Sequence, residues 1–83
     1  MDGEVFKTRD LSLATAVSLL SGTDPTLEAD QRGKVIFLFP GSEEINRLVV
    51  AYNDGSMVAP VVDFVERLKS LRSTMYNLRE GIR

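Results

Sequence analysis

The chain of 83 residues contains neither cysteine nor histidine. Without cysteine it has no disulfide, no thiolate nucleophile and no thiolate zinc site, and without histidine it has no serine–histidine pair and no imidazole metal ligand. Any catalysis would have to rest on carboxylates, lysine, tyrosine or hydroxyl groups. We therefore expect a non-enzymatic protein with no cofactor and no bound metal.

The sequence also has no long apolar run. No stretch approaches the ~18 consecutive apolar residues that a membrane-spanning helix needs. The acidic start of the chain, residues 1–4, has neither the positive charge nor the apolar core of a secretory signal. We expect a cytoplasmic protein with no membrane partner. Because no repeat, low-complexity segment or linker divides the chain, residues 1–83 are predicted to form a single domain.

Charge is distributed unevenly along a chain whose net charge is −2. Residues 1–33 carry a net charge of −3, residues 34–63 carry −2, and residues 64–83 carry +3. An acidic body with a basic last segment can complement a second copy of itself, or it can present cations to an anionic partner. Since a chain of this length supports only a marginal core, enlargement of the core by homodimer formation is expected.

A strand and a helix open the predicted fold. Residues 4–8 form a short β-favouring run, expected at the edge of a sheet. Either Thr8 or Asp10 can cap the following helix, because a side-chain oxygen there accepts from a free amide of the first turn. Gly22 is expected to end this helix in a left-handed conformation. The apolar positions at helical spacing are Leu13, Ala14, Val17 and Leu20.

A hairpin follows. Residues 26–30 alternate polar and apolar and predict a half-buried strand, and residues 31–33 form a turn in which Gly33 supplies a positive φ. Residues 34–39 predict a strand that is apolar on both faces, and such a strand requires cover on both sides. We expect it in the centre of the sheet. The chain's own helices can cover one face and leave little for the other, which is a second reason to expect a homodimer.

Two further helices complete the prediction. Ser42 is expected to cap the first of them, with Glu43 and Glu44 placed favourably against its dipole. Pro60 suits the first turn of the last helix, which runs to about Arg79. The predicted buried face of the earlier helix consists of Ile45, Leu48, Val49 and Tyr52. The predicted fold is α+β, in the order β-α-β-β-α-α, with a three-stranded sheet packed by three helices and a long last helix.

An apolar stripe on the last helix recurs at alternating spacings of three and four and predicts burial along its length. Its members are Val61, Phe64, Leu68, Leu71, Met75, Leu78 and Ile82. The stripe also fits three heptads of a coiled coil, but in a parallel homodimer Arg67 would face Arg72 of the second chain. We therefore expect the helix to pack within its own domain and to add its C-terminal half to a dimer contact. The candidate interface residues are Ile36, Leu38, Met75, Leu78 and Ile82.

A basic stripe adjoins the apolar one on the same helix. It consists of Lys69, Arg72, Tyr76, Arg79 and Arg83. Cations neutralise phosphates, and a tyrosine stacks on an unpaired base. Lysine and arginine side chains also commonly lie beside a buried apolar stripe, with their methylene groups packed on the apolar surface. Binding of an acidic protein is a third possible function of the basic stripe. We expect a protein-interaction or oligomerisation domain, with nucleic-acid binding through this stripe as the alternative.

Three other clusters have both a chemical and an ordinary explanation. Residues 39–42 lead into a helix N-terminus that could hold phosphate, but they lack P-loop spacing and its lysine, so capping is expected. Residues 53–56 lack the alternating acids of a calcium loop and predict a turn. Glu28 and Asp30 lie on one outward strand face and could act as an acid/base pair or bind a divalent cation, with Tyr52 as another possible catalytic group. We expect Glu28 and Asp30 to be ordinary solvent-exposed strand residues.

Residues 5–14, VFKTRDLSLA, resemble the opening of a small uncharacterised domain family of bacteria and their phages. Members begin with an aromatic residue and a Thr-x-Asp step into an apolar helix. They continue with a glycine, a short hairpin ending in an apolar strand such as residues 34–39, and a final helix resembling residues 64–76. The resemblance implies an intracellular bacterial or phage accessory domain, and it brings no activity, cofactor or catalytic residue with it.

Overall fold

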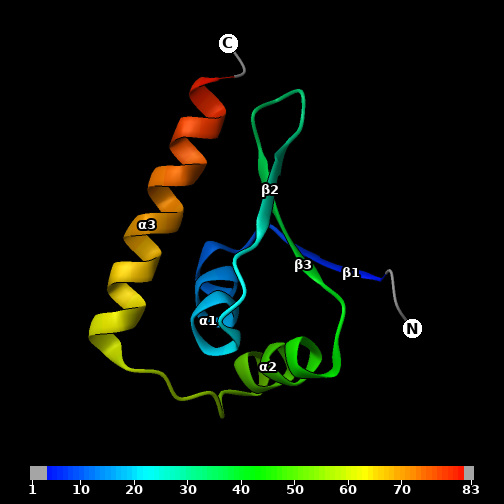
Figure 1. The fold of residues 1–83 in the computed structure, drawn as a ribbon, viewed down its shortest axis with the longest axis vertical. Coiled ribbons are helices and arrows are strands. Elements are labelled where there is room, and N and C mark those ends of the chain that lie inside the picture. The colour runs from blue at the N-terminus through cyan, green and yellow to red at the C-terminus, as the bar shows by residue number, and fades with distance from the viewer. Residues whose placement is uncertain (1–3, 82–83) are drawn as a thin grey trace.

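The computed structural model describes residues 4–81 as three strands and three helices. In chain order these are β1 (Val5–Thr8), α1 (Leu11–Ser21), β2 (Thr26–Ala29), β3 (Val35–Pro40), α2 (Glu43–Asp54) and α3 (Val61–Glu80), as Figure 1 shows. This order confirms the predicted α+β fold, its β-α-β-β-α-α sequence of elements and its long last helix.

The sheet is antiparallel, with strand order β1-β3-β2. The strand that is apolar on both faces therefore occupies the centre, as predicted. Phe6 pairs with Phe39, and Leu27 pairs with Phe37. Because paired residues point to the same side of a sheet, these four side chains share one face. Phe37 and Phe39 are almost completely buried there, and the Phe6 and Phe39 ring centroids lie 6.4 Å apart.

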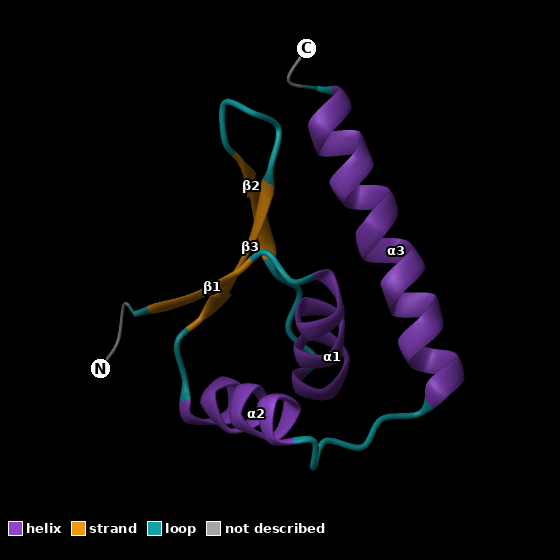
Figure 2. Ribbon diagram, turned by 180° about the vertical axis from the view of Figure 1, so that it is seen from behind, coloured by secondary structure: helices purple, strands orange, loops and turns teal. Residues whose placement is uncertain are grey.

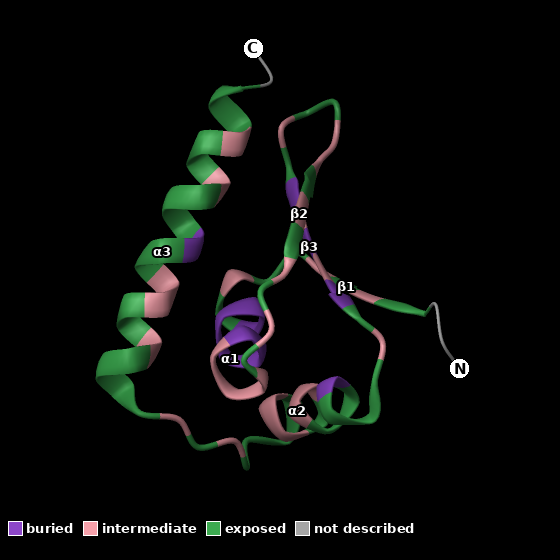
Figure 3. Cartoon of the chain, in the orientation of Figure 1, coloured by how far each residue is buried: buried purple, intermediate pink, exposed green. Residues whose placement is uncertain are grey.

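All three helices lie on this one side of the sheet (Figures 1 and 2). The helix at the centre is α1, which contacts both α2 and α3 as well as β1. Residues 13–18 are buried without interruption, which Figure 3 shows as the purple part of α1. The sequence predicted only one buried face here. It also included Leu20, which is half-buried, and omitted Thr15 and Ser18, which are completely buried. Small side chains let neighbouring elements approach α1 from several directions.

Both predicted helix caps are present. The Leu13 N–H donates to the Asp10 carboxylate at 3.1 Å, so Asp10 rather than Thr8 caps α1. The Thr8 hydroxyl instead accepts from the Asp10 N–H. The Ile45 N–H donates to the Ser42 hydroxyl at 3.1 Å and starts α2. These contacts occupy amide donors that a helix start leaves without an intrahelical partner.

Three glycines fix the places where the chain changes direction. Gly22, after α1, and Gly33, in the β2–β3 turn, have φ values of 73° and 80°, as predicted for these positions. Gly41 serves differently: its N–H donates to the Glu4 carbonyl at 2.7 Å, and a Cβ there would lie only 2.6 Å from that oxygen. The start of β1 can approach the end of β3 this closely because Gly41 has no side chain.

Burial of α3 is partial. Leu71 is buried, and the half-buried members of the apolar stripe are Phe64, Leu68, Met75 and Leu78. Val61 is 75% exposed, so the prediction of burial along the whole helix is wrong at its first turn. At 1.5 Å per residue, the 20 residues of α3 span about 30 Å, whereas the 11 residues of α1 beneath it span roughly half of that. The longer helix therefore extends beyond α1 toward the β2–β3 hairpin (Figure 1), whereas Val61, at its other end, borders an open apolar pocket. Ile82 lies outside the described residues.

Arg67 ties α3 to the rest of the helical layer. Its guanidinium donates to the buried Ser18 hydroxyl at 2.9 Å and to the Asp24 carboxylate at 3.0 Å. These partners lie 49 and 43 residues earlier in the chain. They could not be predicted from the sequence, because contacts over such separations leave no local pattern. This tie supports the packing of α3 within its own domain, which the sequence favoured over a coiled coil.

Candidate interaction surfaces

Within residues 4–81, no helix or loop covers the face of the sheet opposite the helices (Figure 2). Its outward side chains follow from the strand register and are Val5, Lys7, Thr26, Glu28, Ile36, Leu38 and Pro40. Ile36 and Leu38, on the central strand, are half-buried among the side chains of the flanking strands, and Val5 is 48% exposed. Lys7 pairs with Leu38 from one side, and Glu28 pairs with Ile36 from the other. We call this surface the open face.

The five candidate interface residues do not share one surface. Ile36 and Leu38 lie on the open face. Met75 and Leu78 belong to α3 and pack against the core on the opposite side of the sheet. Ile82 lies outside the described residues. The open face and the C-terminal half of α3 are therefore two separate surfaces, which the sequence could not distinguish.

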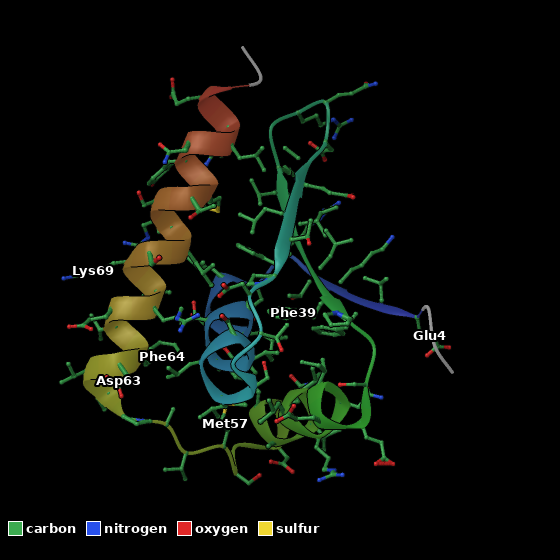
Figure 4. All side chains as sticks on the ribbon, in the orientation of Figure 1. Glu4, Phe39, Met57, Asp63, Phe64 and Lys69 are labelled. Carbon is green, nitrogen blue, oxygen red and sulfur yellow. The ribbon has the colours of Figure 1, made fainter. Side chains whose placement is uncertain are left out.

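The basic stripe lies on an exposed side of α3. Lys69, Arg72, Tyr76 and Arg79 are all exposed, and the Lys69 side chain points away from the rest of the molecule (Figure 4). Neither of the two ion pairs among residues 4–81 involves any of these cations. The Arg79 guanidinium lies 5.9 Å from the centre of the Tyr76 ring, within cation–π range. Arg83 lies outside the described residues.

A cleft separates the C-terminal half of α3 from the β2–β3 hairpin. It has a volume of about 400 Å³, and its lining residues are Arg9, Arg32, Gly33, Lys34, Val35, Met75 and Arg79. Four of these seven residues are cations, and they come from the β1–α1 connection, the hairpin turn and α3. We call this surface the cationic cleft. Only Arg79 belongs to the stripe recognised in the sequence, because Arg9, Arg32 and Lys34 are scattered through the acidic part of the chain.

Asp30 shapes the turn beside this cleft. Its carboxylate accepts hydrogen bonds from the backbone N–H groups of Arg32 and Lys34, both at 2.9 Å. The N–H of Lys34 is the main cause that lowers the pKa of Asp30; desolvation opposes it, and the N–H of Arg32 and the charges of Arg9 and Lys34 add to the lowering. β2 ends at Ala29, so the prediction that Asp30 shares an outward strand face with Glu28 is wrong. The carboxylate bends back to bind the turn instead.

An apolar pocket of about 320 Å³ lies where α1, the end of α2 and the start of α3 meet. Its lining residues are Ala16, Tyr52, Gly55, Met57, Ala59, Val61 and Phe64, of which Met57 and Phe64 are labelled in Figure 4. It contains no acid and no base. Tyr52 lies here, Glu28 on the open face and Asp30 in the hairpin turn, so the three possible catalytic residues lie in three separate places.

The two remaining segments form the predicted cap and the predicted turn. Residues 39–42 end in the Ser42 cap. Residues 53–56 form a turn in which the Ser56 N–H donates to the Asp54 carboxylate at 2.8 Å. The hydroxyl and the N–H of Ser56 lower the pKa of Asp54 by stabilising its charged form. Within residues 4–81, no group of three or more acidic side chains is placed to hold a metal ion.

Comparisons with models of protein families, with curated proteins and with solved structures found no match. The resemblance to a bacterial and phage domain family therefore stays a prediction. In the part of the chain that the structure describes, no helix combines the length and the apolar character needed to cross a lipid bilayer.

Proposed function

We propose that this chain is a non-enzymatic interaction domain that forms a homodimer through the open face. One observation supports this above all: the central strand is apolar on both sides, and the chain's helices cover only one of them. Ile36 and Leu38 form an apolar centre, and Lys7, Glu28 and Thr26 form a polar border around it. A protein interface commonly has such an apolar core within a polar rim.

Charge complementarity favours a second copy of the chain as the occupant of this surface. Lys7 lies on β1 and Glu28 on β2, on opposite sides of the central strand. A twofold axis parallel to β3 would place β1 opposite the partner's β2, so that Lys7 would approach the partner's Glu28, twice per dimer. An axis perpendicular to β3 would instead place Lys7 near the partner's Lys7. The first arrangement is the one we propose.

The molar mass in solution tests this proposal. Light scattering after size-exclusion chromatography should give twice the chain mass of 9.2 kDa. Ile36→Lys should give the monomer mass, because it places a charge in the apolar centre. Val50→Lys is the matched control: Val50 is 61% exposed on α2, so this variant should keep the dimer mass. A monomer at high concentration in the unmodified chain, or a dimer that survives Ile36→Lys, would contradict the proposal.

Reversal of the border charges tests the orientation. Lys7→Glu alone would bring two carboxylates together and should weaken the dimer, and Glu28→Lys alone should weaken it by bringing two ammonium groups together. The double variant exchanges the two charges and should restore the dimer. Sedimentation equilibrium at low and high salt measures these differences, which should shrink as salt screens the charges. A double variant weaker than either single one would exclude the arrangement with the axis parallel to β3.

A further inference from the structure

We propose that the cationic cleft, together with the exposed side of α3 beside it, binds a single strand of nucleic acid. This surface lies on the helical side of the sheet, so the inference is independent of self-association through the open face. The proposed site is built from three separate segments, whereas the sequence indicated a stripe on a single helix.

The first support is the convergence of charge. Arg9, Arg32, Lys34 and Arg79 line one cleft although they are distant in the sequence. None of them takes part in either ion pair found within residues 4–81. Asp30 is the nearby opposing charge, and its carboxylate is bound to two backbone N–H groups of the hairpin turn. A local excess of positive charge remains in a chain whose net charge is −2.

The second support is the extent of the cations. From Arg79 the positive charge continues along α3 to Arg72 and Lys69, at helical spacings of seven and three residues. Positions spaced in this way lie along one side of a helix. A single small anion would contact one or two of these groups. A phosphodiester chain presents a negative charge at every nucleotide and can contact the cleft and the helix together.

The third support is an aromatic surface beside the cations. Tyr76 is 54% exposed, and its ring lies next to the Arg79 guanidinium. Exposed aromatic rings bind single strands because unpaired bases stack on them, whereas the bases of a duplex already stack on each other. Val35 and Met75 add apolar surface to the cleft. This combination favours a single strand over a duplex.

Salt dependence tests the charge count. A fluorescent oligothymidine of about 12 nucleotides, followed by fluorescence anisotropy, suits a site of this kind. With about 0.7 counterions released per cation, the six cations of the cleft and of α3 beside it imply that affinity falls about 340-fold between 50 and 200 mM salt. Arg32→Ala combined with Lys34→Ala should reduce this fall to about 50-fold. Both side chains are exposed and the turn uses their backbone N–H groups, so the double variant should keep the fold and the mass of the unmodified chain.

A matched control separates the cleft from net charge. Arg47, on α2, is exposed at the other end of the molecule from the hairpin and carries the same charge as Arg32. Arg47→Ala should leave the salt dependence at about 340-fold, and Arg32→Ala alone should lower it to about 130-fold. Equal effects of the two substitutions, or no binding at 50 mM salt, would overturn the proposal.

Substitution of Tyr76 tests the choice of ligand. Tyr76→Ala should weaken binding of the oligothymidine about 10-fold, and Tyr76→Phe should preserve it, because phenylalanine retains the stacking surface. Inorganic polyphosphate, which has charge and no bases, should bind the unmodified chain and the Tyr76→Ala variant equally. A duplex of the same length should bind more weakly than the strand. If polyphosphate or the duplex binds as tightly as the strand, or if Tyr76→Ala changes nothing, the inference of a single-strand site is wrong.

Discussion

The two faces of β3 are equally apolar and have different surroundings. Phe37 and Phe39 point toward the helices and are 0% and 1% exposed, whereas Ile36 and Leu38 point the other way and have no helix over them. The difference shows that apolar character alone does not decide what a side chain does. The same hydrophobicity holds the fold together on one face and remains without helical cover on the other.

The helical layer accounts for this difference. The small side chains of α1 allow α2 and α3 to pack around it on the inner face. Three helices of this size form one layer over a three-stranded sheet, and no further segment of the described chain crosses to the second face (Figures 1 and 2). One face of the central strand is therefore left without cover from the helices.

The largest expected effect comes from placing a charge on each face in turn. Phe37→Asp would bury an unpaired carboxylate, at a cost that exceeds the stability of most small domains, so it should abolish the cooperative thermal transition. Leu38→Asp places the same group on the open face and should leave the transition in place. Circular dichroism during heating measures both. Loss of the transition in both variants, or its retention in both, would break the comparison between the faces.

Truncating the side chains by which α3 packs on the core should have the next largest effect on stability. Leu71 is the buried residue of α3, so Leu71→Ala should lower the free energy of unfolding by about 2–4 kcal/mol. Leu68 is half-buried, and Leu68→Ala should cost about half as much. Urea denaturation gives both values. If the order is reversed, the centre of the contact lies nearer the start of α3 than the structure has it.

Removing the tie between α3 and α1 should have a smaller effect. Arg67→Ala deletes the donor to the Ser18 hydroxyl and should cost about 1–2 kcal/mol. The Asp24 contact adds little, since its carboxylate is exposed. Arg72→Ala, on the solvent side of the same helix, should change stability by less than about 0.5 kcal/mol. Urea denaturation of the two variants measures the difference, and equal values would show that the Arg67 contact does not hold α3 in place.

The smallest expected effect concerns the turn that fixes the register of β2 on β3. The pKa of Asp30 is lowered on folding, so its contribution to stability is present above the ordinary aspartate pKa and is lost as pH falls through the lowered value. Observed by NMR, Asp30 should titrate below the ordinary value of about 3.9. Asp30→Asn should lose some stability at neutral pH and show less loss in acid than the unmodified chain. A normal titration of Asp30 would mean that the turn is not held by its carboxylate.

Local chemistry made much of the fold predictable. The caps Asp10 and Ser42 and the turn at Gly33 depend on neighbours within a few residues, so their signals are contained in short segments. The central position of β3 followed from its apolar character on both faces. Burial was harder to predict: Val61 continues the apolar stripe of α3 and is exposed, because periodicity gives the orientation of a side chain and not the reach of the element opposite it.

The candidate surfaces were predictable only in part. The open face followed from the alternation of β3, and the basic stripe followed from helical spacing. The cationic cleft was missed because Arg9, Arg32 and Lys34 lie among acids in the sequence, and only folding brings them to Arg79. The contact of Arg67 with Ser18 was missed for the same reason.

By itself, the sequence determined the type and order of the helices and strands, the ends of most of them, and the presence of a strand that is apolar on both faces, because each depends on side chains a few positions apart. The tertiary structure decided which face of that strand the helices cover, how far α3 is buried, and which cations meet in one cleft. These outcomes depend on the relative positions of elements distant in the chain, which local pattern does not encode.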